Sequence, residues 1–205
     1  LLLKDRIRLF ICCRPAPDRE GLYVSRVGYI DLDLTNPMKI LAFSPKPVIE
    51  LGQRGMFDEF GTYPVSVEKL EDGRLIAAYG GWTRCVSVPF DVSIGIAVSE
   101  NEGRDFKKIG IGPALTKNLT DPFVVTSPKL RFFRNKWYLF YTCGTKWIVD
   151  ENGKPEIIYA LKVATSNDFQ NWHRNGNEII SKRLGEDEAQ ACPDVIKLGD
   201  QFHMF

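Results

Sequence analysis

The chain has 205 residues, which is long enough for a domain with a substantial core. Its 27 Lys and Arg residues nearly cancel its 26 Asp and Glu residues, so the net charge is +1, which argues against nucleic acid and membrane surfaces as partners. The five cysteines include no Cys-x-x-Cys pair, which argues against a disulfide framework or structural zinc and favours a reducing, cytoplasmic compartment.

The main organising feature is a repeat in which an acidic loop leads into a strand that contains a proline. The three copies are FDEFGTYPVSV, TDPFVVTSPKL and GEDEAQACPDVI. Their prolines are Pro64, Pro128 and Pro193, so the steps are 128 − 64 = 64 and 193 − 128 = 65 residues. A unit that recurs in this way usually cannot bury its own apolar face and packs on its neighbours.

In chain order, the elements are short, rich in β-forming residues and bounded by Gly, Pro and Asn. The first segment supplies RLFICC, RVGYIDLD and MKILAF, and the clearest copy supplies strands near 63–67, 75–79, 93–98 and 106–109. Four strands for each repeat of about 64 residues predict an all-β protein, a β-propeller with large blades.

We expect one propeller domain, of which this chain is a fragment of about three blades. The predicted parts are an incomplete blade at 1–57, blades at 58–120 and 121–185, and the start of a further blade at 186–205. In a four-stranded antiparallel blade, the loop that enters the inner strand and the loop between strands two and three emerge on the same side. The acidic loops should therefore share one face with the segments GGWTR and CGTKW, at an axial mouth.

Three motifs carry a resemblance to a known group. The segment SNDFQNW at 166–172 resembles the S-x-D-L-x-x-W signature of five-bladed glycoside hydrolases of families 43 and 32. Thr120-Asp121-Pro122 resembles their R-D-P element, and Ala191-Cys192-Pro193-Asp194 resembles the E-C-P-D motif of family 32. The chain is most similar to a subgroup described as glycoside hydrolase-like propeller proteins, although Ala191 stands where family 32 has its catalytic Glu.

The resemblance implies a five-bladed propeller that hydrolyses an oligosaccharide or polysaccharide with axial carboxylates. Its residues then predict Glu188 as general acid, Asp121 as pKa modulator or transition-state stabiliser, and Asp58, or Glu59 beside it, as base or nucleophile. Two alternatives stay open on the same fold: a glycan-binding propeller without catalysis, and a phosphate-dependent glycoside phosphorylase.

The substrate-binding candidates are aromatic, charged and amide side chains near the predicted mouth. They are Glu59, Trp82, Arg84, Asp91, Lys146, Trp147 and Gln190. Each Trp could stack on a sugar or pack between blades. The cations Arg84 and Lys146, with Arg14 at the matching position, could be solvated or could bind an anionic group such as a uronate, phosphate or sialyl carboxylate.

We expect no cofactor and no metal, since His173 and His203 lack metal-ligand spacing and no nucleotide-binding motif is present.

Overall fold

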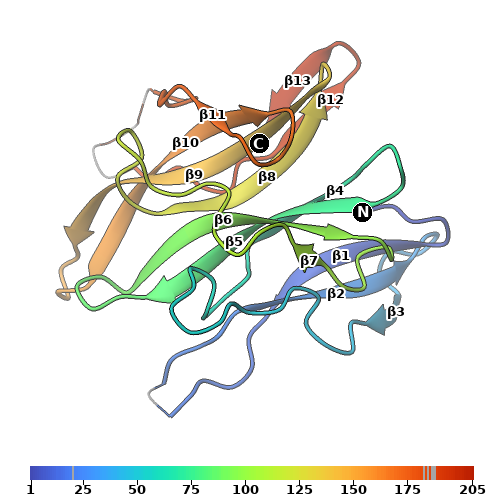
Figure 1. Cartoon of the computed structure of the whole chain (residues 1–205), viewed down its shortest axis with the longest axis horizontal. Coiled ribbons are helices and arrows are strands. Elements are labelled where there is room, and N and C mark those ends of the chain that lie inside the picture. Colours follow the sequence, from blue (N-terminus) through green and yellow to red (C-terminus); the bar gives the residue numbers. More distant parts are fainter. Residues whose placement is uncertain (20, 182, 184, 186–187) are drawn as a thin grey trace.

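The computed structural model describes residues 1–19, 21–181, 183, 185 and 188–205, and over this part the chain is all-β with no helix (Figure 1). The all-β prediction is confirmed. None of the described segments forms a helix that is long and apolar enough to cross a membrane.

The described strands form four antiparallel sheets, each built from consecutive parts of the chain. The first holds β1 (Arg6–Cys13), β2 (Arg26–Asp33) and β3 (Ile40–Phe43) in that order. The second holds β4 (Val65–Lys69), β5 (Leu75–Arg84), β6 (Phe90–Ser99) and β7 (Lys107–Lys108). The third holds β8 (Val125–Phe133), β9 (Lys136–Val149), β10 (Pro155–Ser166) and β11 (His173–Arg174). The fourth is the hairpin of β12 (Val195–Leu198) and β13 (Gln201–Met204).

Local sequence accounts for the tight turns between strands. The β8–β9 hairpin turns on Arg134 and Asn135, which have φ angles of 50° and 57°. Two successive positive φ angles match the right-handed twist of the flanking strands, and Asn tolerates this conformation well. The β4–β5 turn places Gly73 at a φ angle of 88°, where glycine has no steric cost.

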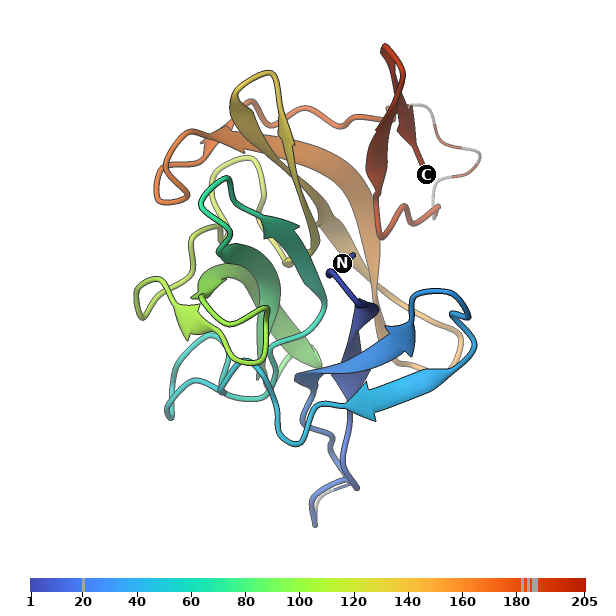
Figure 2. The same ribbon diagram turned by 90° about the vertical axis from the view of Figure 1, so that its right-hand side faces the viewer.

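The sheets are arranged around the region that contains the N-terminus (Figure 2). Arg131 of β8 bridges two neighbouring segments there: it donates to Glu68 of β4 at 2.5 Å and to Asp194, just before β12, at 2.5 Å. Burial raises the pKa of Glu68, and the charge and hydrogen bond of Arg131 oppose this shift. These ion pairs hold β4, β8 and the segment before β12 side by side.

The main core lies between the second and third sheets. Ile76, Ile94 and Ile96 of the second sheet pack with Leu130 and Leu139 of the third, and all are at most 2% exposed. Fully burying a side chain of this size contributes about 1.5–3 kcal/mol. A second cluster joins the first sheet to the second. The sheets therefore bury their faces on one another.

The predicted boundaries of three strands were wrong. The segments GGWTR and GTKW lie within strands and not in loops, because β5 pairs with β6 as far as Arg84↔Phe90 and β9 pairs with β10 as far as Val149↔Pro155. The outer strand expected near 106–109 is only Lys107–Lys108. Because the pairing continues to the ends of β5 and β9, Trp82 and Trp147 lie on paired strands.

Candidate functional site

A short ribbon at residues 60–62 joins the first and second sheets and positions the site. Its backbone pairs on one side with Ser25, through the bonds Ser25 N–H to Phe60 O (3.1 Å) and Thr62 N–H to Ser25 O (3.1 Å). On the other side it pairs with Trp82, which accepts from Phe60 N–H at 3.1 Å and donates to Gly61 O at 3.2 Å. The loop before β2 is thereby fixed beside the end of β5.

Two glycines allow this close approach. A Cβ atom on Gly61 would lie 1.7 Å from the indole nitrogen of Trp82. A Cβ atom on Gly81 would lie 2.4 Å from the ring of Phe57 and 2.5 Å from Cβ of Asp58. Contacts this short do not occur between real atoms, so both positions require glycine for the ribbon to lie flat on β5.

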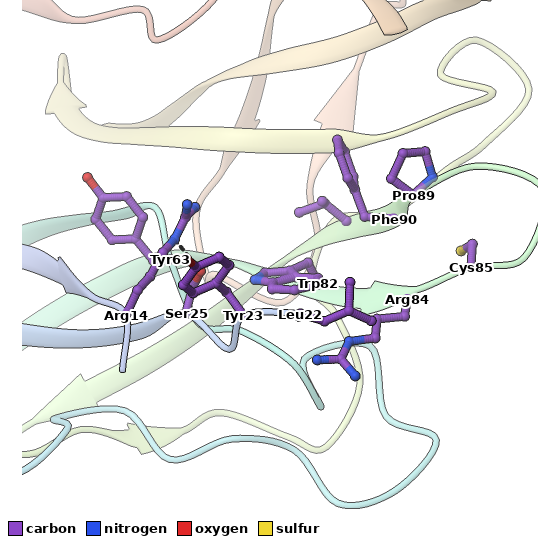
Figure 3. Close-up of a pocket in the computed structure, with 11 residues that line it drawn as sticks. Arg14, Leu22, Tyr23, Ser25, Tyr63, Trp82, Arg84, Cys85, Pro89 and Phe90 are labelled. Atoms are coloured by element: carbon purple, nitrogen blue, oxygen red, sulfur yellow. Dashed lines mark hydrogen bonds between the residues drawn. The ribbon is translucent and has the colours of Figure 1, made fainter. Parts of the chain in front are cut away.

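A cavity of about 520 Å³ opens beside this ribbon (Figure 3). Its walls are mainly apolar, and the aromatic residues among them are Tyr23, Tyr63, Trp82 and Phe90. Figure 3 shows Trp82 between one end that holds Arg14 and Tyr63 and another that holds Arg84 and Phe90. The volume and the aromatic lining suit a small organic ligand.

Two arginines supply the charge of the cavity. Arg84 donates from Nη2 to Asp18 at 2.8 Å, and its guanidinium carbon lies 4.2 Å from the ring centroid of Phe60. Arg14 donates from Nε to the hydroxyl of Ser25 at 3.0 Å. Among the described residues that line the cavity, none is Asp or Glu. The cavity is therefore cationic.

Asp58 does not project into an open mouth as expected, because its side chain is buried beneath the second sheet with 0% of the residue exposed. Its Oδ2 accepts from the hydroxyl of Tyr79 at 2.9 Å and pairs with Lys108 of the outer strand at 2.5 Å. Burial, and then the charge of Asp58, raise the pKa of Tyr79 above its ordinary value. The expectation of an accessible Asp58 was wrong, since its segment packs flat on the sheet.

Asp121 occupies the corresponding place on the third sheet and is also 0% exposed. Its carboxylate accepts from Tyr141 at 2.9 Å, Lys162 at 2.7 Å and Arg174 at 2.8 Å. Burial alone raises the pKa of Asp121, but the hydrogen bonds from Lys162 and Tyr141 and the two positive charges outweigh it and lower that pKa. The expectation that Asp121 reaches the mouth was wrong for the same reason.

Glu188 is half-buried, whereas Asp58 and Asp121 are fully buried. Its Oε1 accepts from Nε2 of Gln190 at 3.1 Å, and the backbone of Gln190 donates to Tyr159 O at 3.1 Å. Glu186 and Asp187, its acidic neighbours in the sequence, lie outside the described residues. Asp58 and Asp121 are held on different sheets, and no hydrogen bond or ion pair between described residues links Glu188 to either of them.

The other predicted binding residues separate into several environments. Trp147 packs edge-on against Phe90, with ring centroids 5.8 Å apart, in an apolar cluster between the second and third sheets, and it does not line the cavity. Lys146 is exposed on β9. Asp91 is bound by Lys117, and Glu59 accepts the backbone N–H of Gly55 at 2.8 Å. Of the two tryptophans, the structure brings Trp82 alone into the cavity.

Several cavity residues were missed from the sequence, above all Tyr63, Tyr23 and Phe90. Tyr63 immediately precedes Pro64, one of the three repeat prolines, so the repeat alignment could have identified it. Tyr23 carries no such signal, since it lies in an irregular loop. Among the described residues, no group of three or more His, Cys, Asp or Glu side chains could hold a metal ion.

The fold is that of glycoside hydrolase-like proteins. A structure described as a glycoside hydrolase superposes on 98% of this chain and 58% of its own, with a TM-score of 0.71 and 15% identity. The family 32 β-fructofuranosidase BmSUC1 of Bombyx mori matches 99% of this chain and 39% of its own, with a TM-score of 0.63 and 18% identity. A protein of family 130, a family of mannoside phosphorylases that contains glycoside hydrolases, matches 92% of this chain and 52% of its own, with a TM-score of 0.64 and 18% identity.

In sequence, the chain is 30% identical over 188 residues to proteins of two Mycobacterium tuberculosis strains, CDC 1551 and H37Rv, both described as uncharacterized. The match covers 91% of this chain and 61% of theirs, so the chain spans less than two thirds of the length of these relatives. No family model matches the sequence.

Proposed function

We propose that this protein acts on carbohydrate and that its sugar-binding site is the Trp82 cavity. The observation that carries the proposal is an aromatic cavity of about 520 Å³ on a glycoside hydrolase-like fold. A sugar presents an apolar ring face that stacks on Trp, and its hydroxyl groups need polar partners, here supplied by Arg14 and Arg84. We further propose that the four sheets belong to a five-bladed propeller, as the resemblance to glycoside hydrolase families 43 and 32 implies.

The chemistry we propose for the whole protein is glycoside hydrolysis, with Glu188 as the general acid. Its support is the partial exposure of Glu188 and the fold of the structural neighbours. Hydrolysis needs a second carboxylate, about 5–5.5 Å away for retention or about 6.5–9.5 Å for inversion. Asp58 and Asp121 are poor candidates for that partner because both are buried against cations.

A second candidate is a glycan-binding protein without catalysis. It is favoured by the residues just before the three repeat prolines, where inner strands begin. These residues are Thr62, Tyr63, Thr126, Ser127, Ala191 and Cys192, and none is an acid. The phosphorylase alternative requires inorganic phosphate to bind the cationic cavity, and the release of a sugar phosphate would identify it.

The first experiment measures binding of the protein to a panel of oligosaccharides by calorimetry, with Trp82→Leu as the test variant. This change keeps an apolar side chain on Gly61 but removes the aromatic face, so we expect about tenfold weaker binding. Phe132→Ala is the matched control, because Phe132 is a 43% exposed aromatic residue outside the cavity. Equal affinity in wild type and a folded Trp82→Leu variant would rule out this site.

The second experiment measures hydrolysis of whichever glycan binds. Loss of a general acid lowers the rate by about 10²–10⁴-fold, so Glu188→Gln should bind the glycan normally and turn it over at that reduced rate. Binding without turnover in the wild type would favour the non-catalytic candidate. Unchanged turnover in Glu188→Gln would remove Glu188 from the chemistry.

A further inference from the structure

The two arginines of the cavity differ in how their charge is compensated. Arg84 is paired with Asp18 at 2.8 Å and covers the ring of Phe60, so its charge is largely used within the protein. Arg14 has a single polar contact among the described residues, from Nε to the neutral hydroxyl of Ser25 at 3.0 Å. Arg14 is exposed, so its two Nη atoms are open to solvent or to a ligand. A guanidinium presents them as a planar fork that suits a carboxylate or phosphate.

The surroundings of Arg14 favour an anion further. None of the described residues that line the cavity is acidic. Tyr63 lies at the same end of the cavity (Figure 3). Burial, followed by the nearby thiols of Cys12 and Cys192, raises the pKa of Tyr63, while the charge of Arg14 opposes this shift. Tyr63 therefore stays neutral and adds no negative charge to this end of the cavity.

Local structure directs Arg14 to this place. Arg14 directly follows β1, and Pro15 after it keeps its backbone extended. Ser25, whose hydroxyl accepts from Nε of Arg14, is held by backbone bonds to the ribbon at residues 60–62. The other side of this ribbon pairs with Trp82 of β5. Arg14, through Ser25, and Trp82 are thus fixed to the same ribbon. The guanidinium of Arg14 lies at one end of the cavity, and the indole of Trp82 lies beside it (Figure 3).

We propose that the cavity selects acidic sugars: the ring stacks on Trp82, and the carboxylate or phosphate of the sugar accepts hydrogen bonds from the Nη atoms of Arg14. This inference rests on the proposed function, since it names the substrate class of the same site. Arg84 acts on the site indirectly: it holds Asp18, which in turn accepts the N–H of Leu22 at 2.9 Å.

The test compares matched neutral and acidic ligands by calorimetry at low and high salt. The pairs are a galactose and a galacturonate oligosaccharide, and a neutral oligosaccharide with and without a 6-phosphate. We expect the acidic member to bind at least about tenfold more tightly at low salt, and this preference to shrink as salt rises. Whether the uronate or the phosphate shows the larger preference identifies the anion.

Arg14→Gln should abolish the preference, which is measured as the ratio of the affinities for the acidic and neutral members of each pair in that variant. Lys46→Gln is the matched control, because it removes one exposed positive charge outside the cavity and should leave the preference intact. Equal affinity for neutral and acidic sugars, or a preference that survives in Arg14→Gln, would overturn the inference and leave the sugar site standing. If neither member of any pair binds, the proposed function itself fails, and the inference with it.

Discussion

The second and third sheets each bury an Asp that is bound by a Tyr and by a cation of the outer strand. They differ because the third sheet adds a second cation. In each sheet an Asp before the first strand accepts a hydrogen bond from a Tyr on the second strand, at 2.9 Å in both cases. In each, a cation on the outer strand pairs with the Asp: Lys108 opposite Ala97, and Arg174 opposite Ala164. The recurrence of this carboxylate is thus explained by packing of the connecting segment on the sheet.

The difference lies on the third strand of each sheet. Lys162 stands opposite Tyr141 and adds a second cation to Asp121, whereas Gly95 stands opposite Tyr79. A Cβ atom on Gly95 would lie 2.4 Å from the ring of Tyr79, so the ring fills that space. Asp58 consequently has one cation, and its buried Oδ1 has no hydrogen-bond partner among the described residues. In both sheets, the recurring Asp therefore binds its connecting segment to the sheet, and the number of cations that compensate its charge differs between the two.

The largest expected effect is that of Asp121→Asn. The amide leaves Lys162 and Arg174 buried without a counter-charge, so we expect the free energy of unfolding to fall by about 3–5 kcal/mol. Asp58→Asn leaves only Lys108 without its counter-charge, so the free energy of unfolding should fall by less. Urea denaturation followed by fluorescence measures both, and equal costs would contradict the comparison.

The next effect concerns the outer-strand cations. Lys108→Met removes the one described cation of Asp58 and leaves a buried unpaired carboxylate, which should cost about 3 kcal/mol. Arg174→Met leaves Asp121 paired with Lys162 and should cost about 1 kcal/mol. Thermal unfolding of the two variants at the same pH measures both losses of stability. A larger loss in Arg174→Met than in Lys108→Met would contradict this account.

Removal of the Tyr hydroxyl groups should have a smaller effect of the same kind. Tyr79→Phe takes one of two described partners from Asp58, whereas Tyr141→Phe takes one of three from Asp121. A hydrogen bond to a charged group contributes about 1.5–3 kcal/mol, so we expect about 2 kcal/mol for Tyr79→Phe and less for Tyr141→Phe. Denaturant midpoints with unchanged slopes would report the difference, and the reverse order would count against our assignment.

The smallest effect is a dependence on pH. The pKa of Asp121 is lowered in the folded state, so its stabilisation is present above its unfolded pKa of about 3.9 and is lost as pH falls through the folded pKa. The difference in unfolding free energy between wild type and Asp121→Asn should stay constant from pH 7 to pH 5. It should then shrink below about pH 4, by at most about 1.4 kcal/mol per pH unit. A difference that grows in acid would contradict the charge balance described here.

The fold could be predicted because its signals are local and repeated. Turn residues such as Gly73 and Asn135 and the spacing of Pro64, Pro128 and Pro193 identify strands and their recurrence directly. The ends of β5 and β9 were harder, since pairing with the next strand extends them through residues that look like loop.

The site could be predicted only in part. Trp82 and Arg84 were identified from the segment GGWTR, but Asp58 and Asp121 were assigned to an open mouth because their sequence pattern shows recurrence and not burial. Nothing in the sequence shows that Lys108 and Arg174, some 50 residues further along the chain in each case, fold back onto these acids (108 − 58 = 50 and 174 − 121 = 53). Tertiary contacts with these cations account for the burial of Asp58 and Asp121.

The central claim is that ligands bind at the Trp82 cavity and not at the recurring aspartates. A crystal structure of the protein with the acidic sugar that binds most tightly tests it directly. We predict the sugar ring against the indole of Trp82 and its anionic group within hydrogen-bond distance of Arg14, with Asp58 and Asp121 still buried against their cations. A sugar bound to Asp58 or Asp121, with those ion pairs opened, would contradict the account.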